Sequence, residues 1–220
     1  MDRGTAAAPD NEPQPTAGPP ARPQRRQQAK ADKRARILHA ARTLFNERGF
    51  EATTTAAITE AAGIGAGTLF LYVASKHDLL VQVFRQELQV LWDDAFDAVN
   101  DNDPLTERII SLFGHVIADH ELNPSLSRAF VKEVMFVGEL ERDSVSEFME
   151  GWSKRLTNVL REAQAQGELS TRVRATTLGV NLYALFFYLL QCRYGGYLKP
   201  ADLMSRLREG VDLQLRPWMT

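Results

Sequence analysis

The chain has 220 residues, of which 44% are hydrophobic and 25% charged, and its formal net charge at pH 7 is −2. This length fits one small domain joined to a larger one, and the hydrophobic content can fill a sizeable core. A single cysteine, Cys192, excludes an internal disulfide framework and fits a reducing compartment. We expect Cys192 to behave as a small buried apolar residue on a helix.

Positive charge is concentrated in one part of the chain. Residues 22–76 carry ten lysines and arginines against four acids, a net charge of +6. Residues 77–220 carry fifteen against twenty-one, a net charge of −6. Because nucleic-acid phosphates attract positive charge, this distribution predicts that the first segment binds nucleic acid and that the second does not.

The N-terminal segment, residues 1–24, is rich in proline and shows no apolar period, so we expect it to be disordered. No apolar signal segment is present there, and the longest apolar run, Leu182 to Leu190, is too short to span a membrane. We therefore expect a soluble, cytoplasmic protein without a membrane partner.

A basic run follows at residues 22–36, with seven basic side chains against the single Asp32. It has two interpretations: a solvated charge run that leads into a helix, or an arm that reaches a minor groove or flanking phosphates. We favour the arm because the run directly precedes the pattern at residues 53–80.

A first amphipathic helix is predicted from about Lys33 to Arg48, with Gly49 placed to end it and Phe50 placed to pack back on it. Its inward residues recur at helical spacing: Ile37, Ala40, Ala41, Leu44 and Phe45. This helix is expected to support the two that follow.

Residues 53–80 hold the most informative pattern, two short helices separated by a turn. Thr54 or Thr55 can cap the first helix, and Gly63 supplies the positive φ that ends it. Its inward positions are expected to be Ala57, Ile58 and Ala61. Ile64 is expected to fill the turn from the apolar side.

The second helix of the pattern is predicted from Ala66 to Tyr72, short enough to lie in a major groove. Leu69 and Val73, four residues apart, are expected to face inward, which leaves Thr68, Leu71 and Tyr72 to face out. The whole spacing is that of a DNA-binding helix-turn-helix.

A long helix is predicted from Lys76 to about Asn100, roughly 35 Å in length and therefore able to connect two domains. Ser75 and Asp78 have the spacing of a capping box at its start. The positive charge of a lysine in a first turn is repelled by the positive end of the helix macrodipole, and we expect no structural contact to offset this. A phosphate bound there would make the interaction favourable. We therefore expect Lys76 to hold a DNA phosphate.

The residues from Gly63 to Leu79 resemble the TetR-type transcriptional regulators. The family pattern is Gly, a β-branched residue, two small or polar residues, Gly-Thr-Leu/Ile-Tyr, two residues, Phe, then Ser/Asn-Lys, an acidic or polar residue and Leu. This chain departs from it at Gly65, where Ser is usual, at Phe70, where Tyr is usual, and at Val73, where Phe is usual. The close match covers about residues 34–84.

The resemblance implies an all-α protein with an N-terminal three-helix DNA-binding domain and a C-terminal helical domain for ligand binding and dimerisation. We place these domains at residues 25–84 and 85–220. The residues expected at the DNA are Thr54, Thr55, Gly65, Ala66, Gly67, Thr68, Phe70, Leu71, Tyr72 and Lys76.

Further helices are predicted by their apolar spacing and by proline and glycine signals, and no strand pattern appears. They are expected from Pro104 to about His120, Pro124 to about Val137, Asp143 to Gln166, residues 171–194, and Pro200 to Leu215. The last two carry apolar residues on more than one face, so they are either buried in the monomer or meet a partner. The resemblance implies a two-fold dimer formed by these two helices.

Aromatic residues are frequent in the middle helices, and core packing is the simplest interpretation of each. Together they can line an apolar pocket, with Asn181 or Glu133 orienting a ligand, and relatives hold an effector in this region. The candidate effector residues are Trp92, Phe96, Phe113, Phe130, Phe148, Trp152 and Tyr183. His115 and Asp119 lie one turn apart, but two ligands on an exposed helix are weak grounds for a metal site, so no metal or cofactor is expected.

The favoured hypothesis is a repressor whose dimer binds a double-stranded, palindromic operator and is released by a small-molecule effector. The alternative is a helical architectural or interaction protein that binds DNA without an effector. No nucleophile and base pair, phosphate-binding glycine loop or zinc spacing appears, so an enzyme is not expected.

Overall fold

The computed structural model describes residues 22–220, without the side chains of residues 22–24, 140 and 141. Every regular element in that part of the chain is a helix, which confirms the predicted all-α class. The predicted disordered tail lies outside the described residues, except that its last three residues begin the first helix. In chain order the elements are α1 Arg22–Arg48, α2 Thr55–Ala61, α3 Ala66–Leu69, α4 Lys76–Asp97, α5 Leu105–Leu122, α6 Pro124–Glu133, the 3₁₀ turn η1 Val134–Phe136, α7 Glu139–Ala165, α8 Ala175–Gly195, α9 Pro200–Leu215 and the 3₁₀ turn η2 Arg216–Trp218.

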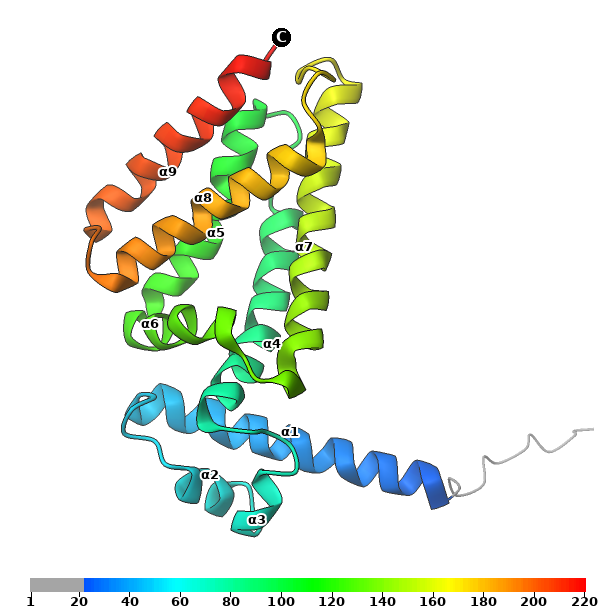
Figure 1. Ribbon diagram of the computed structural model, residues 1–220, viewed down its shortest axis with the longest axis vertical. Coiled ribbons are helices and arrows are strands. Elements are labelled where there is room, and N and C mark those ends of the chain that lie inside the picture. Colours follow the sequence, from blue (N-terminus) through cyan, green and yellow to red (C-terminus); the bar gives the residue numbers. More distant parts are fainter. Residues whose placement is uncertain (1–21) are drawn as a thin grey trace, which may run out of the picture.

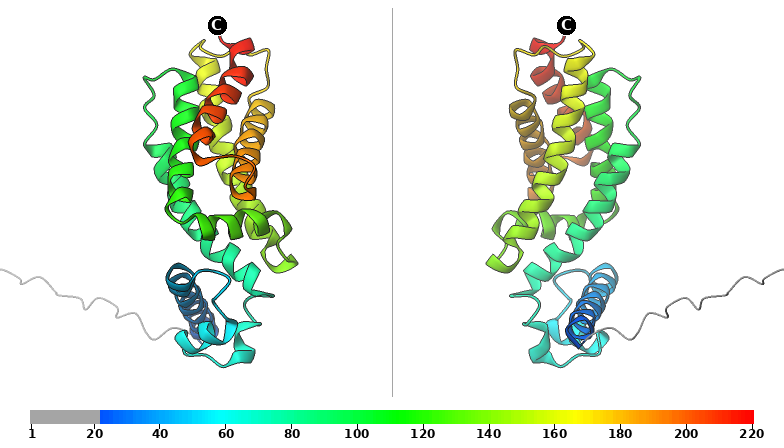
Figure 2. Two further views of the ribbon diagram at one scale, coloured as in Figure 1. Left: turned by 90° about the vertical axis from the view of Figure 1, so that its left-hand side faces the viewer. Right: turned by 90° about the vertical axis from the view of Figure 1, so that its right-hand side faces the viewer.

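The molecule has a small end and a large end. Helices α1, α2 and α3 lie together at one end, and the bundle of α5 to α9 forms the other (Figure 1). Helix α4 starts beside the small unit and runs into the bundle, as the two side views also show (Figure 2). At 22 residues, α4 spans about 33 Å, so one rigid element connects both ends.

Helix α1 begins at Arg22, eleven residues before the predicted start at Lys33. The basic run is therefore helical, and the prediction of its start was wrong. Its residues are mostly strong helix formers, Pro23 is tolerated in a first turn, and the Gln28 side chain donates to Asp32 one turn later, at 2.9 Å. The weak apolar period of this stretch concealed the helix.

The C-terminal helices follow their predicted order closely. Helix α9 has the predicted bounds, whereas α7 begins at Glu139 rather than Asp143 and α8 at Ala175 rather than at residue 171. Gly167 and Gly196 end α7 and α8 with φ of 77° and 85°, a left-handed conformation that glycine adopts without steric cost.

Helix α8 packs against both α7 and α9. It is the one described helix that is long and apolar enough to cross a membrane by length and composition, although a core helix of a globular protein meets the same criterion. Leu182, Phe186 and Leu190 of α8 are buried in the bundle, so its apolar character is explained on that side by packing within the monomer.

Candidate DNA-binding surface and effector cavity

The helix-turn-helix is closed by caps that the sequence predicts. Thr54 is the N-cap of α2, and its Oγ1 accepts from the Ala57 N–H at 3.2 Å. Gly63, with φ of 63°, donates to the Glu60 carbonyl, and Ile64 donates to the Thr59 carbonyl, both at 3.0 Å. These paired bonds satisfy carbonyls at the end of α2 and fix the angle of the turn.

The buried side of α2 differs from the prediction at one position. Ile58 is buried and Ala57 is half-buried as expected, but Ala61 is exposed and Ala62 takes its place in the core. Ile58 and Ala62 are four residues apart and therefore share a face, while Ala61 is rotated by about 100° from that face.

The second helix is shorter than predicted, with α3 ending at Leu69 instead of Tyr72. After it the chain tightens, since Leu71 donates to the Thr68 carbonyl at 3.2 Å and Tyr72 to the Leu69 carbonyl at 2.9 Å, both three residues back. Leu69 and Val73 are both buried, as predicted. This tight turn presents a compact surface at the tip of the unit.

The side chains on that tip are apolar. Phe70 is 55% exposed and Leu71 is 77% exposed, whereas Thr68 and Tyr72 are half-buried. The expectation that Thr68 and Tyr72 face out therefore holds only in part, since both are half-buried and Tyr72 packs against the core. The other predicted contacts divide in the same way: Thr55 is half-buried, and Thr54, Gly65, Ala66 and Gly67 are exposed.

Lys76 has a structural role that the sequence did not indicate. Its Nζ donates to the carbonyls of Phe50 at 2.9 Å and Thr53 at 3.1 Å, and lies 4.3 Å from the centre of the Phe50 ring. The expectation that Lys76 makes no structural contact is wrong, since its side chain bonds the start of α4 to the loop that precedes α2. A phosphate contact by Lys76 stays a prediction.

Thr53 secures the other side of the same loop. It is buried, and its Oγ1 lies 3.1 Å from the Leu44 carbonyl and 2.8 Å from the Gly49 carbonyl at the end of α1. With Lys76 holding the same loop from α4, the loop is bonded to both helices. The helix-turn-helix is therefore positioned by α1 and α4 together.

Asp78 links the start of α4 to the start of α7. Ser75 caps α4 as predicted, accepting from the Asp78 N–H at 3.0 Å. The Asp78 carboxylate does not complete the predicted box: it accepts from the Ser75 hydroxyl at 3.1 Å and from the Gly138 N–H at 3.0 Å. A Cβ on residue 138 would lie 3.3 Å from both carboxylate oxygens, so glycine permits this close approach.

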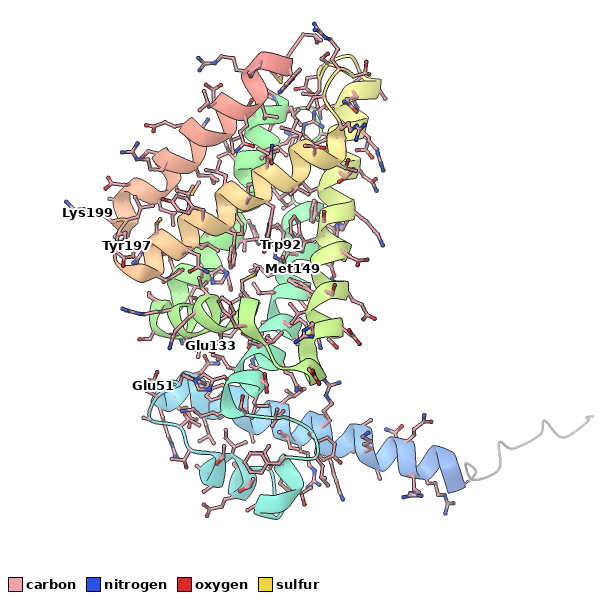
Figure 3. The ribbon with its side chains drawn as sticks, in the orientation of Figure 1. Glu51, Trp92, Glu133, Met149, Tyr197 and Lys199 are labelled. Atoms are coloured by element: carbon pink, nitrogen blue, oxygen red, sulfur yellow. The ribbon has the colours of Figure 1, made fainter. Side chains whose placement is uncertain are left out.

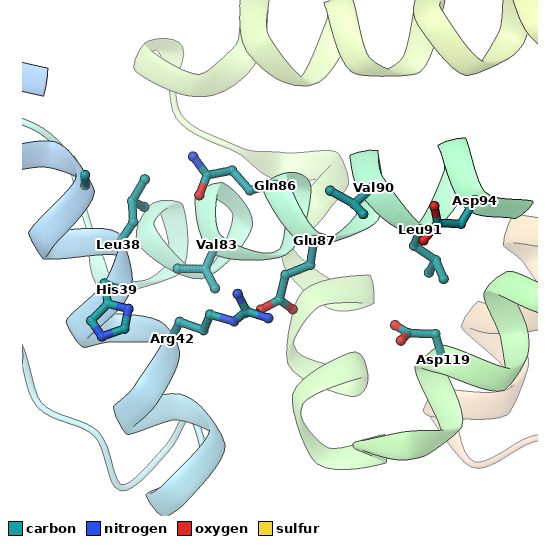
Figure 4. A pocket seen from close by; sticks show the side chains of 11 residues that line it. Leu38, His39, Arg42, Val83, Gln86, Glu87, Val90, Leu91, Asp94 and Asp119 are labelled. Atoms are coloured by element: carbon teal, nitrogen blue, oxygen red, sulfur yellow. The ribbon is translucent and has the colours of Figure 1, made fainter.

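An open cleft of about 570 Å³ is lined by residues of α1, α4 and α5. Figure 4 shows Arg42 of α1 reaching toward Glu87 of α4, with Asp119 of α5 on the far side. The Arg42 Nε lies 2.6 Å from a Glu87 carboxylate oxygen. Burial and, to a smaller extent, Asp119 raise the pKa of Glu87, while Arg42 lowers it. This pair joins the small unit to the middle of α4.

An aromatic cluster fills the centre of the larger bundle. The Trp92 ring stacks on Trp152 with centres 5.6 Å apart and meets Phe186 edge to face at 5.8 Å. Trp152 in turn lies against Tyr183, with ring centres 3.8 Å apart. The side-chain view places Trp92 and Met149 together between α4, α7 and α8 (Figure 3). Helix α4 therefore enters this cluster directly.

A cavity of about 30 Å³ lies beside the cluster, enough for about one water molecule. Four predicted effector residues line it: Trp92, Phe130, Phe148 and Tyr183. Three do not. Phe113 and Trp152 are buried in the ring packing, and Phe96 lies under the Arg155 guanidinium at 4.4 Å.

His120 is a polar residue of the cavity wall, and the sequence analysis did not identify it as a candidate effector contact. Its Nδ1 lies 3.1 Å from the Ser127 Oγ, and that hydroxyl donates to the His120 carbonyl at 2.8 Å. Burial lowers the pKa of His120 to about 4, so the ring is neutral at physiological pH. The sequence signal was its spacing, since His120 continues the buried face of Phe113, Val116 and Ile117 on α5.

The two predicted ligand-orienting residues lie elsewhere. Glu133 faces Lys132 and His77, and Asn181 is exposed on α8. His115 and Asp119 are both exposed, and no group of three potential metal ligands occurs within residues 22–220. The cavity therefore joins apolar walls to one buried neutral imidazole.

Comparison with known proteins connects this architecture to regulators of transcription. Residues 37–83 match the sequence model of bacterial regulatory proteins of the tetR family. The HTH-type transcriptional regulator UidR of Escherichia coli (strain K12) is 28% identical over 144 residues, 62% of this chain and 69% of that protein. The fatty acid metabolism regulator protein of Bacillus subtilis (strain 168) is 25% identical over 146 residues, 64% and 72% of the two chains.

A solved structure has the same fold. The FadR repressor of Thermus thermophilus, crystallised with lauroyl-CoA, aligns with a TM-score of 0.68 at 24% identity and covers 82% of this chain and 92% of that one. Its fold and the match over α1 to α4 agree with the capped helix-turn-helix and the helical bundle described above. The chain belongs to the TetR family of bacterial regulatory proteins.

Proposed function

We propose that this protein is a cytoplasmic homodimeric repressor that binds a palindromic DNA operator and is released by an apolar small molecule. The domains in this proposal are residues 25–84 for DNA and 85–220 for effector and dimer contacts. The observation that carries it is α4, which bonds to the helix-turn-helix at Lys76 and enters the aromatic cluster at Trp92.

The reading surface is the exposed tip after α3. Residues 65–75 contain no Arg, Lys, Asn or Gln, so the bidentate contacts to guanine or adenine are absent from this segment. Phe70 and Leu71 are the exposed apolar side chains, suited to contact thymine methyl groups in a major groove. DNA shape then supplies much of the remaining discrimination.

The effector is an acyl chain in this proposal. The cavity wall is apolar and aromatic apart from His120, and FadR of Thermus thermophilus binds lauroyl-CoA in a fold like this one. Ligand sites commonly measure about 300–1,000 Å³, so the cavity of about 30 Å³ has to open before a chain enters. The closed cavity then corresponds to the DNA-binding state.

Opening the cavity would displace helices of its wall, and these include α4 with Trp92 and α7 with Phe148. Both helices lead to the reading surface, α4 through Lys76 and α7 through Gly138 and Asp78. An effector that binds the open form more tightly would shift the population away from the DNA-binding form. Coupling of about 1–3 kcal/mol is typical of such systems.

The dimer would use α8 and α9. Helix α8 presents an exposed row at four-residue spacing, made by Val180, Ala184 and Tyr188. Two copies would place two reading surfaces about one DNA turn apart, which raises the affinity above that of one short helix.

The test combines operator selection with ligand titration. A binding site is first selected from random duplex DNA with the full chain and mapped by footprinting. Lauroyl-CoA is then titrated against the complex, with free CoA as the matched control and tryptophan fluorescence reporting occupancy near Trp92. We expect a palindromic footprint, a fluorescence change with lauroyl-CoA alone, and a 5- to 150-fold loss of operator affinity, as typical coupling energies give.

Each negative result rejects a different part of the proposed function. Failure to select any sequence rejects specific operator binding. A palindromic operator with a fluorescence response but no change in affinity rejects effector control and favours an unregulated DNA-binding protein. Absence of any fluorescence response to lauroyl-CoA rejects the acyl-chain effector.

A further inference from the structure

The part of α1 that precedes the predicted helix start forms a basic groove beside the reading surface. This groove, of about 680 Å³, is lined by Arg26, Gln27, Ala29, Lys30, Lys33 and Tyr72. The first five belong to α1 and the last follows α3, so the groove joins the extended helix to the recognition turn. No acidic residue is among those that line it.

Helical spacing explains why three cations share this groove. Arg26, Lys30 and Lys33 follow one another at intervals of four and three residues, which places them on one face of α1. All three are exposed. At 1.5 Å per residue they extend over about 10 Å. Asp32, the acid of this run, is instead bonded by Gln28.

The groove is held in place by a buried network. Arg34 of α1 donates to the Gln82 Oε1 of α4 at 3.1 Å, and the Gln82 Nε2 lies 3.4 Å from the Tyr72 carbonyl. Gln82 is 1% exposed. The network therefore bonds the extended helix, the turn after α3 and the long helix α4 to one another, and fixes the basic face relative to Phe70 and Leu71.

The extension lies on the DNA-reading side of the molecule. Helix α1 continues well past α2 and α3 and projects from the small end, level with the recognition turn (Figure 1). Tyr72 connects the two because it belongs to the turn and also lines the groove. A duplex that meets Phe70 and Leu71 would continue under this projecting helix.

We propose that Arg26, Lys30 and Lys33 form a phosphate-binding face that follows the DNA backbone outside the half-site read by the α3 tip. This inference rests on the proposed operator binding and adds a second surface to it. The ligand is the backbone of duplex DNA, and the contacts carry no base-sequence information, because the phosphates are the same at every base pair. A solvated charge run would contribute nothing of this kind.

The test replaces the three cations together and measures operator affinity over a range of salt concentration. Alanine suits the exposed face of a helix, so Arg26→Ala, Lys30→Ala and Lys33→Ala should leave the fold intact. The matched control changes the same charge on the distal bundle, with Lys154→Ala, Arg161→Ala and Arg172→Ala, all exposed and outside α8 and α9. Circular dichroism checks that both variants are folded.

Three lost phosphate contacts in each protomer, six in the operator-bound dimer, should reduce the slope of log affinity against log salt by about 5.4. Between 50 and 200 mM salt the affinity of the triple variant would then fall by a factor about 2,000-fold smaller than that of the unchanged protein. The loss at low salt should be the same for operator and random duplexes, and hydroxyl-radical protection of the flanking backbone should disappear. The control variant should keep its slope and its protection.

The outcomes separate this inference from the proposed function. If the unchanged protein selects no operator, the proposed function fails first. If it binds an operator and the triple variant keeps the slope and the flanking protection, the phosphate-binding face is rejected while operator binding stands. If the variant loses discrimination at flanking base pairs, the extension reads bases in a groove, which also rejects the backbone role.

Discussion

At the scale of single residues, His120 makes the stability of the protein sensitive to acid. Burial lowers its pKa from 6.5 to about 4, so the folded chain binds fewer protons than the unfolded chain between these values. Its contribution is present above pH 6.5 and is lost as the pH falls toward 4. Between about pH 7 and about pH 5 this loss amounts to about 2 kcal/mol.

On acidification from about pH 7 to about pH 5, the free energy of unfolding should fall less in His120→Gln than in the unchanged protein. The expected difference is about 2 kcal/mol, because the variant lacks the buried imidazole. Urea denaturation at the two pH values, followed by tryptophan fluorescence, measures the difference. His115→Gln removes an exposed imidazole from the same helix and is the matched control. An equal dependence on pH in all three proteins would show that His120 is not buried as a neutral ring.

At the scale of elements, the bond between Asp78 and Gly138 connects the first turn of α4 to the first turn of α7. A hydrogen bond to a charged group contributes about 1.5–3 kcal/mol, so Asp78→Ala should lower the free energy of unfolding by about 2 kcal/mol. Asp78→Asn keeps an oxygen that can accept from the Gly138 N–H, and should recover part of this loss.

Hydrogen exchange shows where in the structure Asp78→Ala lowers stability. In Asp78→Ala the amide of Gly138 and the first turn of α7 should exchange faster, while the buried face of α9 should keep its protection. Unchanged exchange at Gly138 in a folded Asp78→Ala variant would contradict the link. The same variant should also show weaker coupling between lauroyl-CoA binding and operator binding, because the bond that connects α7 to the start of α4 is lost.

At the scale of the whole molecule, the exposed row of α8 should determine whether the protein is a dimer. Tyr188 is 64% exposed and Val180 is 56% exposed in the monomer. Val180→Glu with Tyr188→Glu would place charges in an apolar interface and should give monomers at micromolar concentration. Light scattering after size-exclusion chromatography measures the mass, and operator affinity should fall with it.

Leu122→Glu is the control for this prediction, since Leu122 is also exposed and lies at the end of α5. It should leave the mass unchanged. A double variant that stays dimeric would show that another face of the protein forms the interface, and a protein that is monomeric before any substitution would remove the dimer from the proposed function.

The sequence by itself determined the features that depend on neighbouring residues. Thr54 caps α2, Gly63 ends it with a positive φ, and Ser75 caps α4, because each acts on backbone groups within three residues. The buried pair Leu69 and Val73 follows from helical spacing alone. These local signals were also sufficient for the family and for the all-α class.

The tertiary structure decided the features that depend on residues far apart in the chain. Lys76 bonds to carbonyls more than twenty positions earlier and Asp78 to an amide sixty positions later, and no local pattern encodes either bond. The near closure of the cavity depends on how rings from α4, α7 and α8 pack together. The groove beside Tyr72 likewise exists because a network through Gln82 fixes α1 against the recognition turn, and packing of this kind is a property of the folded chain.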